Sequence, residues 1–140
     1  MTRGKETGMN KTLSLPLSAI LALLTVSCVT RVTSIPEDLT PIEYFQKAQE
    51  VVAAWDDYKT ALLYYRTFIE RYPDDAERVV EAEYEIAFLH YKMKDYETAE
   101  TLLKELIRKY KEPGSETLPQ WPYSLAEKIL SEIEETRSSP

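Results

Sequence analysis

Cys28 and His90 are the only cysteine and the only histidine among the 140 residues of this chain. A single cysteine cannot form an intramolecular disulfide, and these two residues cannot supply the ligands of a structural zinc site. The three glycines, at positions 4, 8 and 114, are too few and too scattered for a phosphate-binding loop. With 24 acidic residues, carboxylate pairs occur by chance and do not predict a glycosidase. We therefore expect no catalytic residues, no enzyme activity, no metal site and no cofactor.

Acidic residues outnumber basic ones by 24 to 17, which gives a net charge of −7. Binding to nucleic acid through its phosphates needs clustered lysine and arginine, so the charge balance argues against such a partner. Hydrophobic residues make up 44% and charged residues 29% of a length that suits one folded domain. The composition favours a small acidic binding domain.

The N-terminal stretch has the features of an export signal. Residues 13–26 carry no charge, and three basic residues precede them. These fourteen residues would span about 21 Å as a helix, less than the roughly 30 Å of a bilayer core, so a membrane-spanning helix is the poorer interpretation. The pattern predicts a cleaved signal over residues 1–27, starting at Met1 or at Met9.

The apolar run ends in Leu24-Thr25-Val26-Ser27-Cys28, which resembles the lipobox of bacterial lipoproteins. In that family the cysteine is lipidated and becomes the first mature residue. Ser27 is the expected small residue before the cut, whereas Thr25 stands where the family usually has leucine. The alternative is a plain secretory signal with a chance cysteine near its end.

The lipobox resemblance implies that Cys28 carries acyl chains such as palmitate, which would anchor the protein stably. Val29 follows the cysteine in place of an inner-membrane retention aspartate, so the resemblance implies an outer-membrane lipoprotein that faces the periplasm. Residues 28–40 lack helical periodicity and contain Pro36, which predicts a short tether.

Beyond the tether the chain contains two similar segments. The sequence DYKTA at residues 57–61 recurs as DYETA at residues 95–99, 38 positions later, and further identities follow at the same offset. A fixed period of 20 to 50 residues is typical of stacked supersecondary units. Apolar residues in both segments recur at the spacing of one helical face, so each segment is predicted to be a helix.

A further helix is predicted before each of these segments. Thr40 and Glu43 have the pattern of a capping box, with Pro41 at the first helical position. Asp74 or Asp75 can cap the next helix, which has its own apolar stripe.

A fifth helix is predicted after Pro122, where Ser124 and Glu127 have the pattern of a second capping box. No alternation typical of β-strands appears. The sequence therefore predicts an all-α domain over residues 41–136, made of two helical hairpins and a closing helix, with a polar tail over residues 137–140.

These hairpins resemble tetratricopeptide repeats, in which a small residue lies where two helices cross. Ala61 and Phe68 fit the second helix of the first repeat, and Ala87 fits the small position of the second repeat. Gln49 stands at the small position of the first repeat, and Lys111 replaces the last proline of the second. The period of 38 exceeds the usual 34 or so, which implies longer turns.

One branch of the family is more similar than the rest. The sequences FIERYPD at residues 68–74 and AEYEIA at residues 82–87 resemble the long-period repeats of BamD-type lipoproteins, part of the machinery that inserts β-barrels into the outer membrane. The resemblance implies a scaffold that binds other envelope proteins, among them a β-barrel assembly protein, and no small-molecule substrate. Similar repeats occur in periplasmic Tol-Pal-associated proteins, so the alternative is a partner of a transporter or of a cell-envelope or division complex.

The candidate binding residues are aromatic. Tyr84, Phe88 and Tyr91 fall on one stripe of the third helix, and Tyr123 of the fifth helix could extend the same surface. In the repeats that this chain resembles, the first helices of the hairpins line a groove, where exposed rings would anchor a partner segment. The alternative is that these rings pack against the first and fifth helices.

The remaining conspicuous residues are interpreted as structural. His90 is expected to be packed within its hairpin, and Trp55 and Trp121 are expected to cover the ends of the repeats. Four glutamates of the third helix do not share one face and are expected to be solvated: Glu77, Glu81, Glu83 and Glu85.

Overall fold

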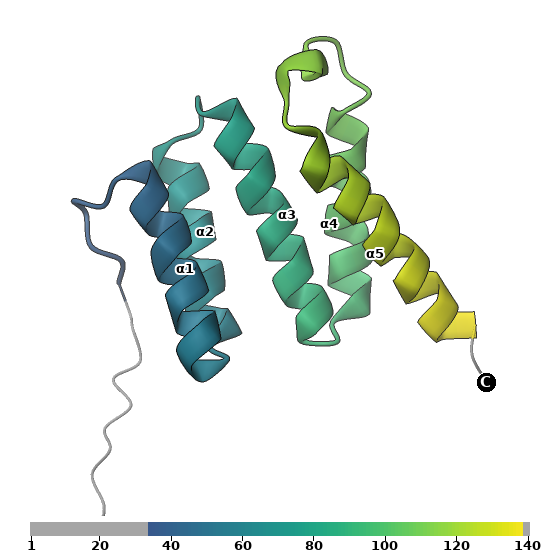
Figure 1. The fold of residues 1–140 in the computed structure, drawn as a ribbon, viewed down its shortest axis with the longest axis horizontal. Coiled ribbons are helices and arrows are strands. Elements are labelled where there is room, and N and C mark those ends of the chain that lie inside the picture. The colour runs from purple at the N-terminus through teal and green to yellow at the C-terminus, as the bar shows by residue number, and fades with distance from the viewer. Residues whose placement is uncertain (1–33, 139–140) are drawn as a thin grey trace, which may run out of the picture. The chain divides into compact units, whose positions relative to one another are not determined.

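A computed structural model describes residues 34–138 of the chain (Figure 1). Five α-helices and no strand occur in this range: α1 (Pro41–Trp55), α2 (Tyr58–Arg71), α3 (Ala76–Lys92), α4 (Tyr96–Lys109) and α5 (Gln120–Ser138). A short 3₁₀ helix, η3 (Ser115–Thr117), precedes α5. The predicted all-α fold of helical hairpins with a closing helix is confirmed.

Helices that follow one another in the chain pack against one another. The pairs α1–α2 and α3–α4 form the two hairpins, α2 and α3 join the hairpins, and α5 contacts both α4 and α3. Figure 1 shows α1, α3 and α5 in a front layer, with α2 and α4 behind. In this layer α3 and α5 run in the same direction, and the first turn of α5 contacts Glu81 and Tyr84 of α3.

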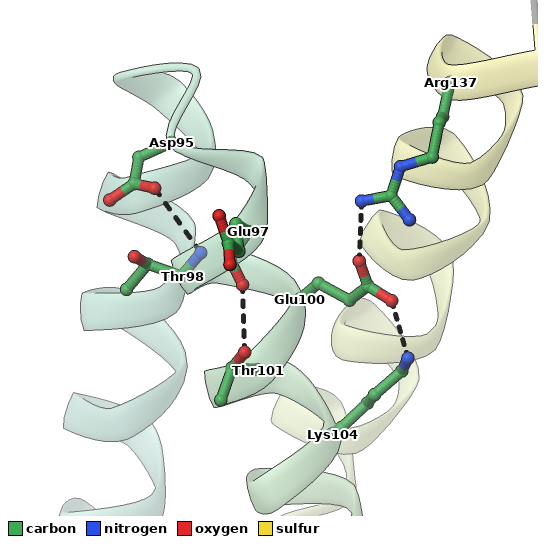
Figure 2. Close-up of polar contacts among 7 residues, drawn as sticks. All are labelled: Asp95, Glu97, Thr98, Glu100, Thr101, Lys104 and Arg137. Carbon is green, nitrogen blue, oxygen red and sulfur yellow. Dashed lines mark hydrogen bonds and ion pairs between the residues drawn. The ribbon is translucent and has the colours of Figure 1, made fainter.

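The helix starts follow from side-chain caps. The capping box at the start of α1 is present, with the Thr40 N–H donating to the Glu43 carboxylate at 2.7 Å. Asp75, rather than Asp74, caps α3. Asp95 accepts the backbone N–H of Thr98 at 3.4 Å at the start of α4 (Figure 2), as the equivalent aspartate of the first repeat does for α2.

The small residue of the first hairpin is Ala48 and not Gln49, so the expected departure from the repeat pattern was wrong. Ala48 is fully buried in α1, as Ala87 is in α3, whereas Gln49 is exposed.

The turn of the first hairpin explains this one-residue difference in register. The first hairpin closes with a hydrogen bond from the Asp57 N–H to the Val51 carbonyl, and the second with one from Asp95 to His90. The first turn therefore encloses one more residue than the second. As a result, each residue of α1 lies one position earlier in the sequence than the 38-residue period predicts from its structural equivalent in α3.

The start of α5 also differs from the expectation. The helix begins at Gln120, and Ser124 lies inside it with its hydroxyl donating to the Gln120 carbonyl at 3.2 Å, so the capping box with Glu127 was wrong. Pro122 is tolerated because the first turn of a helix needs no N–H donor there. The helix continues through Ser138, inside the segment expected to be a polar tail.

The last residues of the expected tether pack against the first hairpin. Ile35 is buried, and the carbonyls of Pro36 and Leu39 accept hydrogen bonds at 2.8 and 3.0 Å from side chains at the C-terminal end of α2. The packed structure therefore begins before residue 41.

Two clusters of buried side chains stabilise the fold. The first joins α1, α2 and one side of α3 and is rich in aromatic rings, including Tyr44, Tyr65 and Phe68. The second joins the other side of α3 to α4 and α5 and is mainly aliphatic: Ala87, Ala99, Leu103, Leu106, Ala126, Ile129 and Ile133 belong to it.

Candidate partner-binding face

An ion pair links the closing helix to α4. The Glu100 carboxylate of α4 lies 2.8 Å from the Arg137 guanidinium of α5 and 2.6 Å from the Lys104 ammonium, as Figure 2 shows. Both cations lower the pKa of Glu100, mainly through their hydrogen bonds. The buried aliphatic residues of α5, Ala126, Ile129 and Ile133, pack this helix against α3 and α4.

Tyr84, the first residue of the predicted aromatic stripe, is buried. Only 6% of its surface is exposed, because its ring stacks on Phe88 at 6.1 Å and meets the edge of Trp121 at 5.3 Å. For Tyr84 the structure therefore favours the packing alternative, with α5 as the neighbour.

Phe88 and Tyr91 are half-buried. Their rings lie 6.2 Å apart. The Tyr91 hydroxyl donates to Glu132 of α5 at 2.9 Å, so the C-terminal end of the stripe is bonded to α5. The Lys92 ammonium lies 6.0 Å from the centre of the Phe88 ring. Part of the Phe88 ring remains open to solvent, and its role in binding stays a prediction.

Tyr123 lies apart from this stripe. Its ring is 5.4 Å from that of Tyr110, at the C-terminal end of α4, and its hydroxyl donates to Glu127 at 2.7 Å. The structure thus groups Tyr123 with α4, and the expected extension of the stripe by this residue is absent.

Two apolar residues of α5 are exposed next to the stripe. Trp121 and Leu125, one helical turn apart, expose 40% and 39% of their surface. The Trp121 indole N–H donates to Glu81 of α3 at 3.3 Å. Trp121 therefore lies on α3 instead of covering an end of the stack, and Trp55, 81% exposed, covers no end within the described residues.

Glu81 and Glu85 lie one turn apart on α3. Glu81 accepts the hydrogen bond from Trp121, whereas Glu85 is close enough to Tyr65 of α2 that its charge adds to burial in raising the pKa of that hydroxyl. Burial raises the pKa of Glu85, and repulsion from Glu81 raises it further. Burial followed by the negative charge of Glu85 also raises the pKa of Tyr84 to about 12. No ion pair or hydrogen bond to Glu85 occurs among the residues that the structure describes.

The expectation that the glutamates of α3 are all solvated was therefore wrong. Glu77 is exposed, but Glu85 is half-buried and Glu83 forms an ion pair with Lys109 of α4. A helix that packs on both of its sides leaves few positions fully in water, and spacing within one helix does not reveal the second neighbour.

We define the α3–α5 face as Glu81, Glu85 and Phe88 of α3 with Trp121 and Leu125 of α5. Sequence analysis singled out Phe88 for binding but treated both glutamates and Trp121 as structural and did not consider Leu125 for binding. These residues are revealed only by the placement of α5 beside α3, which brings Trp121 onto Glu81 and Tyr84.

The opposite side of α3 contains polar contacts of a different kind. His90 is mostly buried and shares hydrogen-bonding distances of 2.9 Å with Asp95 and 3.5 Å with Arg66, as expected of a packed residue. A pocket of about 360 Å³ lies nearby between α2, α3 and α4. Charged side chains, including Arg66, Glu83 and Lys109, line it, so it is not the closed apolar cavity that a small-ligand protein would need.

Two further observations concern the described residues only. They contain no cluster of His, Cys, Asp or Glu suited to a metal ion. No helix formed by them has the length and apolar character needed to cross a membrane. The predicted signal and Cys28 lie outside the described residues.

Comparison with known protein families identifies one repeat in the chain. Residues 81–112, most of α3 and all of α4, match the family model described as tetratricopeptide repeat. The chain thus contains a tetratricopeptide repeat, a unit that generally mediates protein–protein interactions in non-enzymatic scaffolds.

The chain is also similar to an uncharacterised protein of Treponema pallidum (strain Nichols), with 30% identity over 131 residues. The match covers 94% of this chain and 52% of the relative, so the chain spans about half the length of the curated relative that it matches. No solved structure matches the chain.

Proposed function

We propose that this protein is a lipid-anchored scaffold of the bacterial envelope that binds other envelope proteins and serves outer-membrane protein assembly, as BamD-type lipoproteins do. The observation that carries the proposal is the order of its parts. A candidate lipidation site at Cys28 stands a few residues before a stack of helical hairpins that includes a tetratricopeptide repeat. The similarity to a bacterial protein agrees with this setting.

The segment that connects a lipidated Cys28 to the packed structure would be short. The packed structure includes Ile35, so only residues 29–34 separate it from Cys28. An extended chain covers at most about 3.6 Å per residue, which limits this segment to roughly 20–25 Å. A lipidated Cys28 would thus keep the first hairpin close to the membrane surface, where it could meet membrane-embedded partners.

Metabolic labelling tests the anchor. Cells that express the full-length protein are grown with radiolabelled palmitate, and the membranes are separated into inner and outer fractions. We expect label on the wild-type protein in the outer membrane and none on Cys28→Ser. Unlabelled wild-type protein would mean that residues 1–27 are a plain secretory signal or no signal.

Crosslinking in the native cell tests the role. The lipidated protein is purified after crosslinking, and the proteins attached to it are identified by mass spectrometry. Recovery of a β-barrel assembly protein supports the assembly role. Recovery of a transporter component or a division protein instead would overturn that role and favour the alternative, while the scaffold fold would stand.

A further inference from the structure

We propose that the α3–α5 face binds a partner segment that combines apolar side chains with a lysine or arginine, whose cation lies against Glu81 and Glu85 while the apolar side chains cover Trp121, Leu125 and Phe88. This inference deepens the proposed scaffold function and rests on it.

The apolar part of the face is open and already held in place. Trp121 is positioned by its hydrogen bond to Glu81 and by its ring contact with Tyr84. Despite these contacts, Trp121 and the neighbouring Leu125 each leave close to two fifths of their surface in water. Covering an aromatic ring that is already fixed costs little conformational entropy, which is why such residues often dominate the energy of interfaces.

The charge of the face selects the partner. Glu81 and Glu85 form an acidic pair one turn apart on α3, and the hydrogen bond from Trp121 to Glu81 brings this pair next to the exposed apolar residues of α5. Glu85 is half-buried and has no ion pair or hydrogen bond among the described residues, so its carboxylate is partly removed from water without a cation to compensate, which raises its pKa. Two cations of α3 flank the pair: Arg78 interacts electrostatically with Glu81 but is ion-paired with Asp75, and Lys92 lies by the ring of Phe88.

A lysine or arginine of the partner would supply the compensating positive charge that Glu85 lacks. A lysine or arginine placed between the two carboxylates would interact with both, because residues one turn apart on a helix lie about 6 Å apart. An acidic segment would add negative charge to the pair and would be excluded, which gives the face its specificity.

The two tryptophans of the chain allow a direct test. Because Trp55 is exposed, Trp55→Phe should leave the fold intact and make Trp121 the only tryptophan. The full-length variant in a mild neutral detergent is titrated with 14-residue peptides of alanine and leucine that carry lysine, glutamate or glutamine at the same positions. The shift and quenching of Trp121 emission give the dissociation constants.

We expect the lysine peptide to bind at least ten-fold more tightly than the glutamate peptide, with the glutamine peptide between them. The double variant Glu81→Gln, Glu85→Gln should lose this preference, whereas the control Glu70→Gln, Glu134→Gln, which removes two exposed carboxylates elsewhere, should keep it. Circular dichroism verifies that all variants are folded.

The proposal is overturned if the lysine peptide does not alter Trp121 emission, if the glutamate peptide binds equally well, or if the double variant binds as the wild type does. These outcomes differ from failure of the scaffold role. Failure of the scaffold role would show as the absence of any envelope protein in the crosslinking experiment, whatever the peptides do.

Discussion

The two hairpins have the same repeat but place their aromatic rings differently. In the first hairpin the rings interlock inside the core, with Phe68 at 5.1 Å from Phe45 and 5.5 Å from Tyr72. In the second hairpin Leu106 stands at the position of Phe68, and the aromatic residues lie on α3 where it meets α5.

We relate the rings of the first hairpin to the stability of the fold and the partly exposed rings near α5 to binding. Fully buried rings such as Phe68 stabilise their hairpin and have no exposed surface with which to bind a partner. The rings of the second hairpin need α5 to cover them, and α5 covers Tyr84 while it leaves part of Phe88 and Trp121 in water. The number of aromatic residues on a helix is therefore a poor guide to a binding site; their position relative to the next helix decides.

The largest effect should come from the enclosed rings. Phe68→Ala removes a fully buried ring and should lower the free energy of unfolding by about 3–5 kcal/mol. Phe88→Ala should cost less than this, because the ring of Phe88 is only partly buried and part of its surface is already in contact with water. Urea unfolding followed by circular dichroism measures both, and equal losses would contradict the comparison.

A smaller effect is expected from the aspartate caps that the hairpins share. Asp57→Ala and Asp95→Ala each remove a cap from the second helix of a hairpin and should each cost about 1 kcal/mol. Serine at either position should retain most of the stability because it is also a good cap. The same unfolding assay tests this, and a cost at only one of the two positions would show that the repeats are not equivalent there.

Stability should depend on pH through Glu85, which has no acidic counterpart in the first hairpin at Gln46 or Lys47. The folded protein favours the protonated carboxyl, so it retains this proton to higher pH than the unfolded chain, whose pKa is near 4.5. As pH rises above 4.5, this group therefore makes unfolding more favourable. We expect Glu85→Gln to gain stability relative to wild type over that range, in unfolding curves recorded from pH 4 to 7.

The control for that experiment is Glu134→Gln, which changes an exposed glutamate of α5. Its difference from wild type should stay nearly constant with pH. A constant difference for Glu85→Gln as well would mean that Glu85 is solvated in the folded protein.

The smallest effect should come from the ion pair in Figure 2. Arg137→Ala should cost about 0.2–1 kcal/mol, because the arginine is exposed and pairs of this kind contribute little in water. The cost should shrink further in 1 M salt. A loss that is larger, or that does not depend on salt, would assign Arg137 a role in packing α5 beyond its charge.

Sequence patterns predicted the helices well because caps and apolar stripes are local. They predicted the start of α1 at Thr40, and the repeat at residues 95–99 marked the start of α4. They placed the small residue at Gln49 because a single extra residue in a turn cannot be seen in a fixed period. Ser124 matched a cap pattern, but helix formation starting at Gln120 left it in the interior.

The candidate site was harder to predict because it needs two helices that are distant in the sequence. Phe88 was found from its own stripe. Trp121 and Glu81 come together only when α5 lies beside α3, and no spacing within either helix contains that information.

The most direct test of the account uses a photo-crosslinking amino acid in the living cell. It is placed at Leu125, on the α3–α5 face, or at Glu134, an exposed position of the same helix, in the full-length protein with Cys28 intact. We expect a crosslink to an envelope protein from position 125 that is lost on Glu81→Gln with Glu85→Gln, and no such product from position 134. Equal products from both positions, or a product from position 125 that survives the loss of both carboxylates, would contradict it.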